Sequence, residues 1–213
     1  MRHQFLKNNS SDNLTLLFAG WGINASDFWF LKDTETDLLV CSDYRVFDLD
    51  TALLTPYANI RLVGYSLGVW AASYVFRDKK ITFSETIAIN GTPFPVDDTK
   101  GIPVKIYEGT EAALSDVSLQ KFFRRMCGSK ENFQEFMAHT EAKNITELKD
   151  ELRTIQRLSA KNDVSSFRWN KAVISENDAI FPPSHQREAW NKHTEITMLD
   201  TPHFSPFIFK EIV

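Results

Sequence analysis

The amino-acid sequence predicts an α/β fold with a mostly parallel central sheet and helices on both faces. Its strand candidates are short, continuous apolar runs instead of alternating ones, which is typical of strands buried on both faces. Helical segments or long loops separate these runs, as parallel strands require. With 213 residues, the chain is long enough for one well-buried domain and short for two, so we expect a single domain over residues 1–213.

The predicted strands and helices follow one another regularly along the chain. The first strand, at residues 14–19, ends in Gly20-Trp21-Gly22, and Ser26-Asp27 is placed to cap a short helix at residues 27–31. A later helix begins at a proline and covers residues 182–190. The other strands are predicted from apolar runs at residues 37–42, 60–63, 86–90, 171–175 and 195–199.

The middle of the chain, at about residues 97–170, has few strand signals and is mostly helical and highly charged. Apolar residues recur at helical spacing at 119–126 and 133–137, and residues 147–158 form the clearest amphipathic pattern of the chain. Residues 104–107 fit either a strand or a turn of helix. We therefore predict a helical lid insertion at about residues 97–170 that lies over one end of the sheet.

Composition argues against several classes of function. Lys and Arg total 24 against 28 Asp and Glu, a net charge of −4 that makes no case for binding nucleic acid. Cys41 and Cys127 are too few for a disulfide framework, and two reduced thiols fit a reducing cytoplasm. The N-terminus lacks the apolar segment of a signal peptide, and no apolar run is long enough to cross a bilayer. We expect a cytoplasmic protein with no membrane partner, and a monomer, because no long apolar stripe calls for a second copy.

The most informative segment is Gly64-Tyr65-Ser66-Leu67-Gly68, which lies between an apolar run and a buried helix. It matches G-x-S-x-G, in which a serine occupies a sharp strand-to-helix turn. The turn imposes strained dihedral angles on the serine, and the two glycines remove side chains that would clash. This context predicts that Ser66 is a nucleophile with its Oγ exposed at the helix N-terminus.

A serine nucleophile needs a base, and the base needs an orienting carboxylate. In a strand-turn-helix site of this kind the chain order is serine, acid, histidine, with the acid and the histidine in loops after late strands. Asp178 and His203 occupy such positions, and we predict them as the acid and the base. Glu176 and Asp200 compete for the acid role. Glu176 lies too close to the strand end, and Asp200 lies too close to the histidine in sequence. The histidines with a weaker case as the base are His3, His139, His185 and His193.

The tetrahedral oxyanion of acyl transfer needs two backbone donors. The N–H of Leu67, at the start of the helix, is one candidate, and the N–H of Trp21, in the loop after the first strand, is the other. The alternative for Trp21 is an ordinary core aromatic. The sequence contains no H-E-x-x-H, no paired C-x-x-C and no G-x-G-x-x-G, so we predict neither a metal site nor a cofactor.

These features together resemble the α/β-hydrolase superfamily and, within it, the BioG type of pimeloyl-[acyl-carrier protein] methyl ester esterase. The serine turn is common to many hydrolases and says nothing of substrate, whereas Asn90-Gly91-Thr92-Pro93 and Arg124-Arg125-Met126-Cys127 are much more specific. The resemblance covers nearly the whole chain. It rests on residues 18–22, 41–45, 64–72, 88–93, 122–127 and 202–204.

The resemblance implies removal of the methyl group from pimeloyl-[acyl-carrier protein] methyl ester in the pathway to biotin, with an acyl carrier protein as partner. Ser66 would attack the ester carbonyl, His203 would pass the proton to methanol, and Asp178 would orient the ring. Leu67 and Trp21 would form the oxyanion hole. The thioester that joins the acyl chain to the carrier must survive.

The charge of the predicted lid offers a physical reason for such a partner. Carrier proteins are acidic, and basic lid residues could attract one. These residues are Lys121, Arg124, Arg125, Lys149, Arg153 and Arg157. Because acidic residues are interleaved with them, an ordinary solvated helix face is the alternative.

Two other functions compete with this one. A general short-chain carboxylesterase or acyl thioesterase would use the same residues without a carrier-protein partner. A binding module that has lost the reaction is disfavoured, because it would not need serine, aspartate and histidine in this order.

Overall fold

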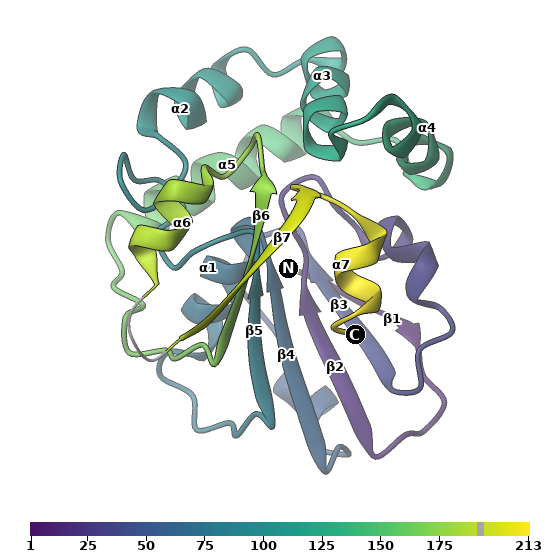
Figure 1. Ribbon diagram of the computed structural model, residues 1–213. Helices are drawn as coiled ribbons and strands as arrows, with labels where there is room; N and C mark the ends of the chain where they lie inside the picture. The colour runs from purple at the N-terminus through teal and green to yellow at the C-terminus, as the bar shows by residue number, and fades with distance from the viewer. Residues whose placement is uncertain (191–193) are drawn as a thin grey trace.

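The central element is a seven-stranded sheet, seen in a computed structural model that describes residues 1–190 and 194–213 (Figure 1). The strand order is β1-β3-β2-β4-β5-β6-β7. β1 pairs with β3 in the antiparallel sense, and every other neighbouring pair is parallel. The predicted α/β fold with a mostly parallel sheet is confirmed. The strands are β1 (Arg2–Lys7), β2 (Asn13–Phe18), β3 (Asp37–Ser42), β4 (Asn59–Tyr65), β5 (Glu85–Ile89), β6 (Lys171–Asn177) and β7 (Glu195–Pro202).

Helices cover both faces of this sheet. In Figure 1, α1 lies behind the sheet and α7 lies in front of it, where α7 packs against η1. Burial on both faces explains why β3 is buried along its whole length. The bounds of these elements are η1 (Ala25–Leu31), η2 (Thr51–Leu54), α1 (Leu67–Phe76), α6 (Pro183–Ala189) and α7 (Pro206–Lys210).

Four helices lie in the chain between β5 and β6, within the region for which the sequence predicts an insertion. Figure 1 shows them above the carboxyl ends of the strands, and we call them the lid. They are α2 (Val104–Ala112), α3 (Asp116–Cys127), α4 (Lys130–His139) and α5 (Ile145–Ser159). The end of the sheet that they cover is the end where α/β folds place their ligands.

Two local predictions differ from the structure. The sequence predicts no strand at residues 2–7, where β1 forms the edge of the sheet. Its first three residues are exposed, so no apolar run marks it, and pairing with β3 holds it in place. The prediction that Ser26-Asp27 caps the short helix is correct only for Asp27, which belongs to the capping box, because the N-cap residue is Asn24. The backbone N–H of Asn24 donates to Asp27 Oδ2 at 2.7 Å.

The undecided segment at residues 104–107 is helical and opens α2. His193, one of the weaker base candidates, lies outside the described residues. Within residues 1–190 and 194–213, no helix is both long and apolar enough to cross a bilayer.

Candidate active site

The strand-to-helix turn holds Ser66 between the end of β4 and the start of α1. Its backbone has φ 55° and ψ −126°, a region that residues other than glycine rarely occupy. A Cβ atom on Gly68 would lie 2.2 Å from the carbonyl oxygen of Phe18, and one on Gly64 would lie 2.9 Å from Val69 Cα. Both glycines are therefore required for close backbone approach, in the way the sequence pattern predicts.

Three predicted residues meet at this turn. His203 follows β7 directly and Asp178 follows β6, and all three side chains are buried. His203 Nδ1 lies 2.7 Å from Asp178 Oδ2, and since a carboxylate only accepts, Nδ1–H is the donor. His203 Nε2 then accepts from Ser66 Oγ–H at 3.0 Å. The structure thus brings Ser66, His203 and Asp178 into one continuous hydrogen-bonded chain.

The carboxylate of Asp178 is held by more than the histidine. Its Oδ1 accepts the backbone N–H groups of Ile180 and Phe181, each at 2.8 Å. Its Oδ2 also accepts from Gln186 Nε2 at 3.0 Å. These bonds hold the carboxylate in the orientation in which it accepts the hydrogen bond from His203.

The competing acids lie elsewhere. Glu176 is exposed at the end of β6. Asp200 Oδ1 accepts a hydrogen bond from Asn177 Nδ2 at 2.6 Å on the exposed side of β7. Neither is hydrogen-bonded to His203.

Asn90 lies at the site, although its position in the sequence predicts no role for it. It is fully buried, with φ 48°, directly after β5. Its Nδ2 donates to the carbonyl oxygen of His203 and to Ser175 Oγ, each at 2.8 Å, and its Oδ1 accepts the backbone N–H of Ser175 at 2.7 Å. Asn90 therefore fixes the loop that carries the histidine to β6. Its sequence signal is a polar residue at a buried strand end, followed by Gly-Thr-Pro.

The two predicted backbone donors, Leu67 and Trp21, belong to two different turns of the chain. Leu67 is the first residue of α1, so its N–H has no acceptor inside the helix. Trp21 lies in the turn after β2, and its backbone N–H has no acceptor among the described residues. The Trp21 side chain is buried and its indole Nε1–H donates to the carbonyl oxygen of Leu148 at 3.0 Å. Neither backbone N–H group has a hydrogen-bond acceptor among the described residues, so the oxyanion role of Leu67 and Trp21 stays a prediction.

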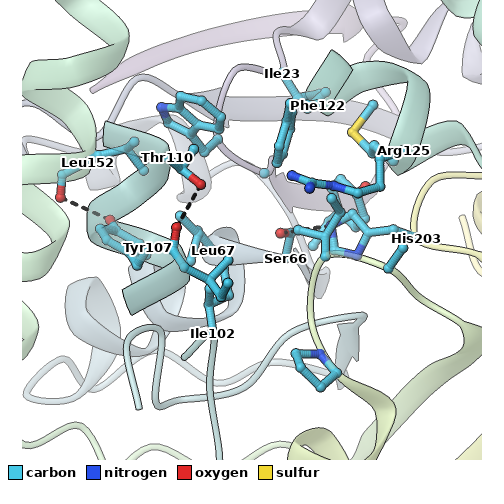
Figure 2. A pocket seen from close by; sticks show the side chains of 18 of the residues that line it. Ile23, Ser66, Leu67, Ile102, Tyr107, Thr110, Phe122, Arg125, Leu152 and His203 are labelled. Atoms are coloured by element: carbon cyan, nitrogen blue, oxygen red, sulfur yellow. Dashed lines mark hydrogen bonds between the residues drawn. The ribbon is translucent and has the colours of Figure 1, made fainter. Parts of the chain in front are cut away.

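A cavity of about 210 Å³ lies directly above Ser66, between the sheet and the lid. Figure 2 shows Ile102, Tyr107 and Leu67 on one side of Ser66, Arg125 and His203 on the other, and Phe122 above it. Its lining is mostly apolar, and Arg125 is the only arginine, lysine or carboxylate among the described residues that line it. Such a cavity suits an aliphatic chain whose reactive group reaches the serine.

The basic lid residues predicted to attract a carrier protein differ in their surroundings. Lys121, Arg124 and Arg125 are exposed on α3, where Arg124 and Arg125 both line a groove beside the cavity. Arg153, on α5, forms an ion pair with Glu111 at 2.8 Å, which occupies its guanidinium on the α2 side. Arg157 is exposed on α5, and Lys149 is half-buried there.

Tyr65 forms one wall of the site. Its ring centre lies 5.1 Å from that of His203, and its hydroxyl has no hydrogen-bond partner among the described residues. Burial raises the pKa of Tyr65 well above its ordinary value, so the hydroxyl stays neutral. Tyr65 therefore offers the histidine an uncharged, packed surface.

Comparison with known proteins identifies relatives over nearly the whole chain. Residues 1–212 match the family model described as pimeloyl-ACP methyl esterase BioG. The chain is 47% identical over 197 residues to a Bacteroides fragilis protein named malonyl-[acyl-carrier protein] O-methyltransferase. That match covers 92% of this chain but 40% of the relative, so the chain spans less than half the length of that protein.

Solved structures show the same fold. The crystal structure of BioG from Haemophilus influenzae aligns with a TM-score of 0.90 and 32% identity, covering 98% of this chain and 96% of that one. A lipase-esterase related protein from Clostridium acetobutylicum aligns with a TM-score of 0.71 at 15% identity, covering 100% of this chain and 99% of that one, and so shares the fold alone. The fold is that of the α/β-hydrolases, and the chain belongs to the pimeloyl-ACP methyl esterase BioG family.

Proposed function

We propose that this chain hydrolyses the methyl ester of pimeloyl-[acyl-carrier protein], giving methanol and pimeloyl-[acyl-carrier protein], as a step of biotin biosynthesis. The observation that carries the proposal is the hydrogen-bonded chain from Asp178 through His203 to Ser66 at the floor of an apolar cavity. Membership of an esterase family supports the same reaction class.

The proposed reaction has two steps, acylation of Ser66 and hydrolysis of the acyl-enzyme. Ser66 Oγ attacks the ester carbonyl carbon while His203 Nε2 takes its proton, and Asp178 holds the ring in the required tautomer. The carbonyl oxygen becomes an oxyanion, which the N–H groups of Leu67 and Trp21 would receive. When the carbonyl re-forms, methoxide leaves with the proton from His203 as methanol. Water then repeats these steps on the acyl-enzyme and releases the carboxylate and Ser66.

The surroundings of Ser66 support a long, carrier-bound substrate. The apolar lining accommodates an aliphatic chain, and exposed Lys121, Arg124 and Arg125 on α3 can attract an acidic carrier surface near the cavity. Arg153 contributes less to this docking, because its guanidinium is paired with Glu111. The name of the Bacteroides relative also refers to methyl transfer on a carrier-bound acid, the chemical change that an esterase of this kind would reverse.

The decisive test is hydrolysis of pimeloyl-carrier-protein methyl ester beside a short p-nitrophenyl ester, with the wild type and Ser66→Ala. The expected result is demethylation by the wild type alone, with the thioester intact. Cleavage of the small ester alone would favour a general carboxylesterase without a carrier partner. Release of the carrier thiol would identify an acyl thioesterase.

A further inference from the structure

The lid helix α5 is hydrogen-bonded to the loop that carries the Trp21 backbone donor. Trp21 Nε1–H donates to the carbonyl oxygen of Leu148 on α5 at 3.0 Å, in a buried position. The carboxylate of Glu151, one turn later, accepts the backbone N–H of Tyr44 at 3.0 Å. The Tyr44 hydroxyl in turn donates to the carbonyl oxygen of Ala19 at 2.7 Å.

These bonds lie on either side of a short, buried stretch of backbone at residues 19–21. The N–H of Ala19 bonds to the carbonyl oxygen of Cys41 as the last contact with β3, and the chain then turns at Trp21. Before Gly20, the carbonyl oxygen of Ala19 accepts from the Tyr44 hydroxyl. After Gly20, the indole of Trp21 donates to the carbonyl oxygen of Leu148. Both bonds lead to α5, the first through Glu151 and the second directly.

Glu151 is an unusual residue for its position. The buried face of α5 recurs at helical spacing and is otherwise apolar, comprising Leu148, Leu152 and Ile155. A buried carboxylate costs free energy that an apolar side chain would not. Its hydrogen bond to the Tyr44 N–H gives a physical reason for a side-chain acceptor oxygen there.

The start of α5 is also anchored to the body of the protein. Lys143, just before the helix, forms a 2.9 Å ion pair with Asp27 of η1, and both side chains are buried. The helix therefore has a defined position from which to hold the loop.

We propose that Glu151 and Tyr44 are positioning residues, through which α5 fixes the Trp21 N–H for the developing oxyanion. This inference rests on the proposed function in one respect, namely that Trp21 supplies a donor to the oxyanion. It goes beyond that function because it makes the lid part of the catalytic geometry, in addition to any role in binding the substrate.

The test compares two substitutions at one position. In Glu151→Gln the amide oxygen can still accept the Tyr44 N–H, whereas in Glu151→Met a side chain of similar size has no such acceptor. We expect Glu151→Met to lower kcat on a p-nitrophenyl ester about tenfold or more, less than the loss of a whole oxyanion donor, with KM changed less than about threefold. Glu151→Gln should restore most of kcat. Tyr44→Phe should lower kcat in the same way.

The matched control is Tyr57→Phe, which removes a tyrosine hydroxyl bound to Asp37 Oδ2 at 3.0 Å, before the start of β4 at the opposite end of the sheet. It should lower the unfolding midpoint without changing kcat. If Glu151→Met and Tyr44→Phe behave like Tyr57→Phe, α5 only stabilises the fold and the proposal is overturned.

A second measurement separates this proposal from the choice of substrate. A fluorophosphonate probe reacts with an activated serine, and its developing oxygen charge uses the same donors. We expect Glu151→Met to slow labelling of Ser66 and Glu151→Gln to restore it, even if pimeloyl-carrier-protein methyl ester is not the substrate. Equal labelling rates in all three proteins would exclude the positioning role.

Discussion

The serine turn and the loop after β2 supply the two sides of one site, yet they are built in opposite ways. The turn at Ser66 is specified by a short local pattern, with Gly64 in β4 and Gly68 in α1, and its one long-range backbone bond among the described residues is from the Ser66 N–H to the Ile89 carbonyl oxygen of β5 at 2.8 Å. The loop at Trp21 is held by side-chain bonds to residues far along the chain, at sequence separations of 107 for Tyr44 and Glu151 and 127 for Trp21 and Leu148. We therefore expect the loop at Trp21 to be the more sensitive of the two to changes in α5.

The largest expected effect concerns the residues that meet at the serine turn. Asp178→Asn should lower kcat about 10⁴-fold, because an amide cannot hold His203 in the tautomer that accepts the serine proton. Steady-state kinetics on the p-nitrophenyl ester would measure it. Asp200→Asn, which alters the exposed competing acid, should leave kcat within about twofold of the wild type. A larger loss in Asp200→Asn would transfer the orienting role to Asp200.

A second prediction concerns the steric requirement of the turn itself. Gly68→Ala would place a Cβ atom 2.2 Å from the Phe18 carbonyl oxygen, so the backbone must move. We expect the free energy of unfolding to fall by more than about 3 kcal/mol in urea denaturation. In Gly109→Ala the new Cβ meets nothing within 4 Å, and alanine should stabilise α2 by about 0.5–1 kcal/mol. If Gly68→Ala and Gly109→Ala change the free energy of unfolding equally, the steric requirement for glycine at position 68 is contradicted.

A third prediction concerns the pH dependence of stability, to which the buried Glu151 should contribute. Burial raises the pKa of Glu151 to about 7 from its usual 4.5; the Tyr44 N–H lowers it in part, Asp43 raises it, and Arg45 and Lys143 lower it. The folded protein therefore keeps a proton that the unfolded chain has lost between these two values. The free energy of unfolding should fall as pH rises through this window, by up to about 3 kcal/mol.

Glu151→Gln removes this titration. Urea denaturation at pH 5 and pH 8 should show that the variant loses less stability than the wild type over the interval, while other titrating groups contribute equally to both. A difference between the two proteins that does not change with pH would mean that Glu151 titrates near its ordinary value.

The smallest expected effect concerns the outer face of the lid. Reversing the charges of Arg124 and Arg125 should raise KM for the carrier-bound ester about tenfold and leave KM for a small ester unchanged. Arg153→Gln should change KM for the carrier-bound ester less than about threefold, because that guanidinium is paired with Glu111 and exposed ion pairs contribute little. Equal changes for both substrates would argue against docking of the carrier on α3.

The sequence by itself determined the features that depend on neighbouring residues. Continuous apolar runs located the parallel strands, and G-x-S-x-G located Ser66, because steric limits on the backbone act over a few residues. The order of serine, aspartate and histidine at strand ends then indicated Asp178 and His203, since parallel strands bring their carboxyl ends to one edge.

Only the tertiary structure decided which distant groups meet. It showed β1 as an edge strand, Asn90 bonded to the His203 loop, Arg153 paired with Glu111, and Glu151 buried against Tyr44. In sequence, Glu151 is one of three acidic residues on a charged helix. Its role depends on which face of α5 meets the body and on a partner about a hundred residues away, and no local pattern carries that information.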